Sequence, residues 1–187
     1  MNTKTRKLTF CAIMIGLATV LSFVKLFEMP QGGSVTLASM VPIMLISYKC
    51  DIKWALTSSA VYGFIQLLQG VAYVPADIVG AILCILLDYI VAFGVLGLAG
   101  TFGKLFKNPY AKIIGGSAIA VALRFVCHFL SGILIWSSYA DGTGLSPAVY
   151  SAAYNGSFLS VELGISIVIM VILSKFILKE VVNKSYR

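Results

Sequence analysis

Charged residues are scarce in this sequence. Only 11% of its 187 residues are Asp, Glu, Lys or Arg, whereas 59% are hydrophobic, and the mean hydropathy is +0.97. A soluble domain of this length has too little interior to bury so much apolar surface. The scarcity of charge therefore excludes an ordinary soluble globular protein and indicates that lipid surrounds the chain.

Residues and motifs for metal binding and ATP hydrolysis are also scarce or missing. The sequence holds a single histidine, His128, and its cysteines form no CxxC pair; they are Cys11, Cys50, Cys84 and Cys127. A standard zinc site needs several clustered His or Cys ligands, so we expect no metal site and interpret the cysteines as structural thiols. The sequence has no GxxxxGK[ST] phosphate loop, and therefore the chain cannot couple ATP hydrolysis to work by itself.

Long apolar stretches fill most of the chain. A helix that crosses a bilayer needs roughly 20 mostly apolar residues, and stretches of suitable composition lie at residues 8–27, 34–48, 53–72, 77–101, 111–136 and 148–178. Turn-forming or charged segments separate them. We therefore expect an all-α integral membrane protein of the cell membrane, with one domain over residues 1–187 and six transmembrane helices. A secretory signal peptide is the alternative for the first stretch, but the stretch is too long, which favours a retained helix.

The basic residues fall on one side of this predicted topology. In a soluble protein the formal charge of +7 would suggest a nucleic-acid partner, but here the basic residues separate apolar stretches, and we expect no such partner. Loops on the cytoplasmic side are enriched in Lys and Arg. With six spans and the N-terminus inside, only Lys25 and Arg124 fall outside the cytoplasmic segments. Both termini are therefore predicted to be cytoplasmic.

A few polar side chains interrupt the expected spans: Asp88, Tyr89, Arg124, His128 and Glu162. A charge at the centre of a membrane helix costs about 2.5–3.5 kcal/mol on insertion scales, so such residues usually face the bundle interior and often mark function. Arg124 and His128 share a helix face because they are four residues apart. An ion pair of Arg124 with Asp88 or Glu162 is an alternative to substrate contact, and a hydrogen-bonded interior histidine is an alternative to a ligand-binding one.

Aromatic and polar residues also gather between residues 128 and 155. They are His128, Trp136, Tyr139, Tyr150, Tyr154 and Asn155. An interfacial belt explains Trp and Tyr at head-group depth, but it does not explain Asp88, His128 or Asn155. A carboxylate, an imidazole, an amide and several aromatic faces together suit a flat, cationic, hydrogen-bonding ligand.

The first apolar stretch carries small residues at helical spacing. Ala12 and Gly16 form a small-xxx-small pattern, and Ala18 extends it. Such a surface lets another helix approach closely. The pattern alone is equally typical of packing inside the bundle.

Five blocks along the chain match one known family. They are Ala12-xxx-Gly16, Gly32 to Leu37 leading to Pro42, Leu87-Asp88-Tyr89 followed by Leu96 to Gly100, His128-Phe129-xx-Gly132-xxx-Trp136-xx-Tyr139-Ala140, and Tyr150-Ser151-xxx-Asn155-Gly156. Over nearly its whole length the chain resembles the thiamine-specific substrate-binding component of energy-coupling factor transporters. Some members of that family have Glu in place of Asp88, and Trp and Glu in place of Gly33 and Leu37.

The resemblance implies a six-helix bundle that binds extracellular thiamine with high affinity and is neither an enzyme nor dependent on a cofactor. Asp88 would face the thiazolium cation, and His128 and Trp136 would pack around the rings. Tyr150 and Asn155 would hydrogen-bond the aminopyrimidine, much as Asn reads adenine. Two further tyrosines would complete the site, namely Tyr89 and Tyr73.

The resemblance also implies partners. Two cytoplasmic ATPases and a transmembrane coupling subunit would supply the energy for import, and Ala12, Gly16 and Ala18 would form the docking face. A self-sufficient secondary transporter of another small cationic or aromatic solute is an alternative, although neither inverted repeats nor a through-path of ionisable residues is clear in the sequence. An intramembrane enzyme using His128 and Asp88 is a third reading, but no convincing nucleophile motif accompanies these two residues.

Overall fold

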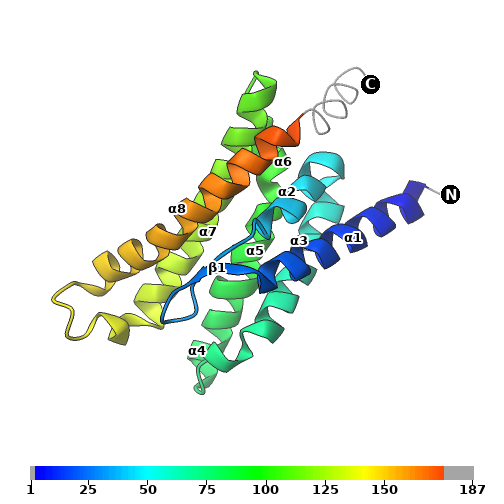
Figure 1. The fold of residues 1–187 in the computed structure, drawn as a ribbon. Helices are drawn as coiled ribbons and strands as arrows, with labels where there is room; N and C mark the ends of the chain where they lie inside the picture. Colours follow the sequence, from blue (N-terminus) through cyan, green and yellow to red (C-terminus); the bar gives the residue numbers. More distant parts are fainter. Residues whose placement is uncertain (1–2, 175–187) are drawn as a thin grey trace.

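The computed structural model describes residues 3–174, which form mostly long helices (Figure 1). Six helical segments follow one another along the chain: α1 (Thr3–Phe23), α2 (Met40–Lys49), α3 (Ile52–Gln69), a composite helix over residues 78–103, α7 (Pro109–Leu134) and α8 (Pro147–Ile172). The composite helix consists of α4 (Ile78–Cys84), η2 (Ile85–Ile90), α5 (Val91–Gly94), η3 (Val95–Leu98) and α6 (Ala99–Gly103). This architecture confirms the predicted all-α class.

Four of these segments are long and apolar enough to cross a membrane, namely α1, residues 78–103, α7 and α8. By contrast, α2 has 10 residues and spans about 15 Å, half of the roughly 30 Å of bilayer hydrocarbon. The start of α1 and the end of α8 lie at the same end of the bundle (Figure 1). The count of six spans and the cytoplasmic termini stay predictions.

Two of the longest helices begin at clear sequence signals. Asn108 caps α7, because its side-chain oxygen accepts from the backbone N–H groups of Tyr110 and Ala111, and Pro109 occupies the first turn. Ser146 caps α8 in the same way, and Pro147 follows it. Proline suits this position because its missing N–H would have no partner in the first turn. These caps fix the residues at which α7 and α8 begin.

The segment between α1 and α2 differs from the prediction. Residues 34–36 do not start a helix but form strand β2 (Ser34–Thr36), which pairs in antiparallel register with β1 (Lys25–Glu28). Gly32, with φ +87°, makes the turn, and Ala38, with φ +59°, ends the hairpin before α2. The predicted second span, 34–48, was therefore wrong at its start, because backbone pairing between strands competes with helix formation there.

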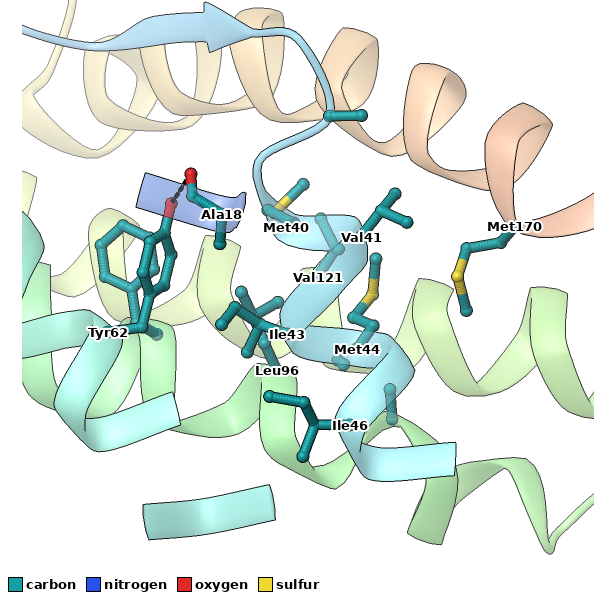
Figure 2. Close-up of a cluster of buried hydrophobic side chains, with 14 of the residues drawn as sticks. Ala18, Met40, Val41, Ile43, Met44, Ile46, Tyr62, Leu96, Val121 and Met170 are labelled. Atoms are coloured by element: carbon teal, nitrogen blue, oxygen red, sulfur yellow. Dashed lines mark hydrogen bonds between the residues drawn. The ribbon is translucent and has the colours of Figure 1, made fainter. Parts of the chain in front are cut away.

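The short helix α2 lies at the centre of the core. Met40, Ile43, Met44 and Ile46 are fully buried, and Figure 2 shows them surrounded by side chains from the other helices. The composite helix approaches α2 closely at Gly100, where a β-carbon would overlap the backbone of Ser47.

Candidate functional site

A cavity of about 230 Å³ lies beside the β1–β2 hairpin. It is bordered by the C-terminal ends of α1, α3 and α7, the N-terminal part of α8 and the π-helical segment η2. A cavity for a single water molecule needs only about 10–15 Å³, so this cavity has room for a small organic molecule. With the predicted cytoplasmic N-terminus, it would lie in the outer half of the membrane.

All seven binding residues expected from the sequence line this one cavity: Tyr73, Asp88, Tyr89, His128, Trp136, Tyr150 and Asn155. They come from η1 (Val71–Tyr73), η2, α7, α8 and the residue before η4 (Ser137–Ala140). Segments up to 82 residues apart, counted from Tyr73 to Asn155, therefore contribute to one chamber.

The Asp88 carboxylate is the centre of the polar network. Its Oδ1 lies 2.9 Å from His128 Nδ1, and its Oδ2 accepts hydrogen bonds from Ser131 Oγ at 2.5 Å and Trp136 Nε1 at 3.3 Å. The side chain is 18% exposed. Three donors hold the carboxylate in place and compensate part of its desolvation. Ser131 was not expected from the sequence, although its spacing of three from His128 places both on one face of α7.

Arg124 reaches Asp88 only through His128. Its Nε donates to His128 Nε2 at 3.2 Å, so Nε2 must be the unprotonated nitrogen and Nδ1–H points to Asp88. The guanidinium lies 4.1 Å from the centroid of the Phe93 ring, within cation–π range. In the described residues Arg124 forms no direct ion pair with Asp88 or Glu162, so the alternative of such a pair is wrong.

Neighbouring residues of η2 point to different sides of the cavity. Asp88 contacts α7, whereas Tyr89 donates its hydroxyl proton to the Gly70 carbonyl at the end of α3, at 3.1 Å. A β-carbon at Gly70 would overlap the Tyr89 hydroxyl. The wider π-helical turn, a feature that often occurs at functional sites, places this polar pair between two helices.

Two pairs of parallel rings flank the cavity. Trp136 and Tyr139 stack with centroids 5.6 Å apart and an interplanar angle of 4°, and Tyr150 and Tyr154 stack at 6.1 Å and 14°. Aromatic faces attract organic cations. Together with the Asp88 carboxylate they make this side of the cavity suited to a flat, positively charged ring.

Asn155 is buried, and its amide nitrogen is already bound. Nδ2 donates to the Ser151 carbonyl at 3.0 Å, the Ser151 hydroxyl at 3.2 Å and the His128 carbonyl at 3.3 Å. Across residues 3–174 no donor reaches its Oδ1. The sequence suggested an amide that both donates and accepts, whereas the structure leaves the acceptor oxygen for a ligand.

The hairpin is fastened to α8 on the other side of the cavity. The backbone N–H of Gly33 donates to the Tyr154 hydroxyl at 3.0 Å. Further along β2, Glu162 Oε1 accepts from the backbone N–H and, at 2.7 Å, from the hydroxyl of Thr36. Glu162, 3% exposed, therefore holds the hairpin, a role that the sequence did not indicate. Tyr73 stands at the rim, 47% exposed, with its ring against Gly32.

The three residues expected to form a docking face do not share one face. Ala12 and Gly16 are exposed on α1, and a β-carbon at Gly16 would meet nothing within 4 Å. Ala18 is fully buried, and its carbonyl accepts from the Tyr62 hydroxyl at 3.5 Å (Figure 2). Two residues advance a helix by about 200°, which turns Ala18 away from Gly16. The expectation for Ala18 was therefore wrong.

Known proteins resemble this chain along most of its length. A family profile described as "Thiamine transporter protein" matches residues 8–182. The thiamine transporter ThiT of Bacillus subtilis (strain 168) is 32% identical over 163 residues, which cover 79% of each chain. A solved structure of ThiT from Listeria monocytogenes superposes with a TM-score of 0.76 at 26% identity, covering 96% of this chain and 99% of that one.

Proposed function

Because this chain belongs to the thiamine transporter family, which makes it a multi-pass protein of the cell membrane, we propose that it is a substrate-binding component that captures extracellular thiamine with high affinity for ATP-driven import. The family consists of transporter proteins and not of enzymes.

The arrangement around Asp88 is the observation that carries the proposal. Thiamine has a permanently charged thiazolium ring and an aminopyrimidine ring, joined by one carbon. The stacked pairs Trp136–Tyr139 and Tyr150–Tyr154 offer aromatic faces for these rings, at about 0.5–2 kcal/mol per good cation contact. Asp88 supplies the compensating negative charge. The free Oδ1 of Asn155 accepts from the exocyclic amino group.

The cations near the cavity are engaged with other side chains. Arg124 is bound to His128 and Phe93, and Lys25 pairs with Glu28 at 2.6 Å. Tight binding of a diphosphate needs several convergent Arg or Lys donors. Thiamine is therefore preferred over its diphosphate.

Energy for import comes from other subunits in this proposal, because the chain has no phosphate loop. Two cytoplasmic ATPases act through a transmembrane coupling subunit, which docks on the exposed Ala12 and Gly16 of α1. A self-sufficient secondary transporter makes the opposite prediction, since the chain alone would then move thiamine across a vesicle membrane.

Titration of the purified chain in detergent tests the binding proposal. Trp136 lies in the cavity and Trp54 does not line it, so thiamine should quench the tryptophan fluorescence with a Kd well below about 1 μM, a binding free energy beyond about −8 kcal/mol. The variant Trp136→Phe should lose most of this signal. Absence of saturable binding would refute the proposal, and uptake by vesicles that hold the chain alone would favour the secondary transporter.

A further inference from the structure

The cavity has a second polar end, away from Asp88. This end lies between α1 and α3, where Ser22, Gln66, Gln69 and Gly70 line the wall. The segment η2 packs against both α3 and α7, so it separates this end from the side formed by α7 and α8. None of the roles assigned to the aromatic rings, Asp88 or Asn155 uses it.

Gln66 carries the one cavity-lining side-chain nitrogen in the described residues that is buried and has no hydrogen-bond partner. The position of Gln66 on α3 explains its orientation. Gly63 and Gly70, one turn away on either side, lie against Tyr89, so the Gln66 side chain between them faces the composite helix and the cavity. A buried amide N–H without a partner is unfavourable. Because this nitrogen is closed off from the cavity, the Gln66 side chain has to turn toward the cavity before an acceptor atom of a bound molecule can satisfy it.

The neighbouring groups indicate which acceptor fits. Gln69 Oε1 already accepts from Ser22 Oγ at 3.2 Å, and the nearby Lys25 is paired with Glu28. Because no free cation of the described chain faces this end, it suits a neutral oxygen better than a phosphate or a carboxylate. An alcohol is such a group, because its oxygen can accept a hydrogen bond from the Gln66 N–H.

We propose that Gln66 forms a second subsite, which binds the alcohol oxygen of the ligand's side chain while the rings occupy the side formed by α7 and α8. The inference rests on the proposed function for the identity of the ligand, since thiamine carries a hydroxyethyl group on its thiazolium ring. The rings then lie beside Asp88 with the hydroxyethyl group directed past Tyr89 toward α3.

The test compares thiamine with the analogue in which an ethyl group replaces the hydroxyethyl group, each titrated into the purified full chain. The wild type should bind thiamine about 3- to 10-fold more tightly, the range of one hydrogen bond to a neutral partner. Gln66→Leu should abolish this preference, because thiamine loses its donor and the ethyl group gains an apolar neighbour. Gln66→Met should do the same and serves if the leucine variant does not fold.

Gln69→Leu is the matched control, three residues along the same helix, and should change both affinities by the same factor. Equal binding of the two ligands by the wild type would overturn the subsite. An equal loss of affinity for both ligands in Gln66→Leu would also overturn the subsite. That result is expected if a bound water molecule, and not the ligand, accepts from the amide. Failure of the wild type to bind either ligand would instead refute the proposed function, and this inference with it.

Discussion

At the scale of single residues, the site depends on one carboxylate. Asp88 accepts three hydrogen bonds from the protein, and the role proposed for it is to balance the charge of a bound cation. The tautomer of His128 belongs to the same arrangement, because Arg124 donates to Nε2 and thereby directs the Nδ1 proton to Asp88. Arg124 and His128 therefore act together to hold the Asp88 carboxylate in position.

Asp88→Asn should weaken thiamine binding by about 10- to 100-fold, because it removes the charge and turns one acceptor into a donor that faces Ser131 or His128. A neutral analogue of the thiazolium ring should lose less. Titration of both ligands into both proteins measures the difference. An equal loss for the charged and the neutral ligand would show that Asp88 is structural.

The sequence predicted the seven cavity residues through motif spacing and family resemblance, but not what each atom does. Ser131 and Gln66 were missed, because an isolated Ser or Gln in an apolar stretch gives no signal of its own. The free oxygen of Asn155 could not be predicted either, since it depends on contacts of Nδ2 with Ser151 and His128.

At the scale of secondary-structure elements, the β1–β2 hairpin covers the cavity and is tied to α8. Its two fastenings, Gly33 to Tyr154 and Thr36 to Glu162, join residues 121 and 126 positions apart. Such long-range contacts leave no local pattern, which is why residues 34–36 were predicted to be helical. The β-branched Val35 and Thr36 after Gly32-Gly33 were the available signal for a strand.

Replacing Glu162 should loosen the hairpin. Glu162→Leu removes both hydrogen bonds to Thr36 and should raise the thiamine dissociation rate roughly 10-fold, with less effect on association, because affinity changes fall mainly on dissociation. Stopped-flow tryptophan fluorescence gives both rates. The control Glu162→Gln keeps an acceptor oxygen and should be milder; equal dissociation rates in Glu162→Leu and the wild type would contradict a fastening role.

At the scale of the whole molecule, the cavity and the proposed docking surface occupy different places along α1. The cavity lies at the C-terminal end of α1, whereas the exposed Ala12 and Gly16 lie near the middle of this helix. Four apolar helices of 21 to 26 residues hold these two regions in one bundle. The class of protein could be predicted from composition alone, because 59% hydrophobic residues leave no soluble alternative.

Bulky substitutions on α1 should distinguish the two faces. Gly16→Leu adds a side chain into open space, so it should leave thiamine binding unchanged but reduce uptake at least about 10-fold in vesicles that also hold the coupling subunit and ATPases. Ala18→Leu, in contrast, overpacks a buried position and should cost about 1–3 kcal/mol of stability. Uptake assays and thermal unfolding in detergent measure these effects. Undiminished uptake by Gly16→Leu would place the docking surface elsewhere.

The shortness of α2 has a consequence for the membrane around it. A 10-residue helix leaves about half of the hydrocarbon thickness uncrossed, and the hairpin continues the chain there. Backbone amides that are not in a helix cannot face lipid, so the hairpin has to stay covered by protein or water. The cavity borders this hairpin, so on the N-terminal side of α2 the chain forms the wall of a chamber instead of further helical turns.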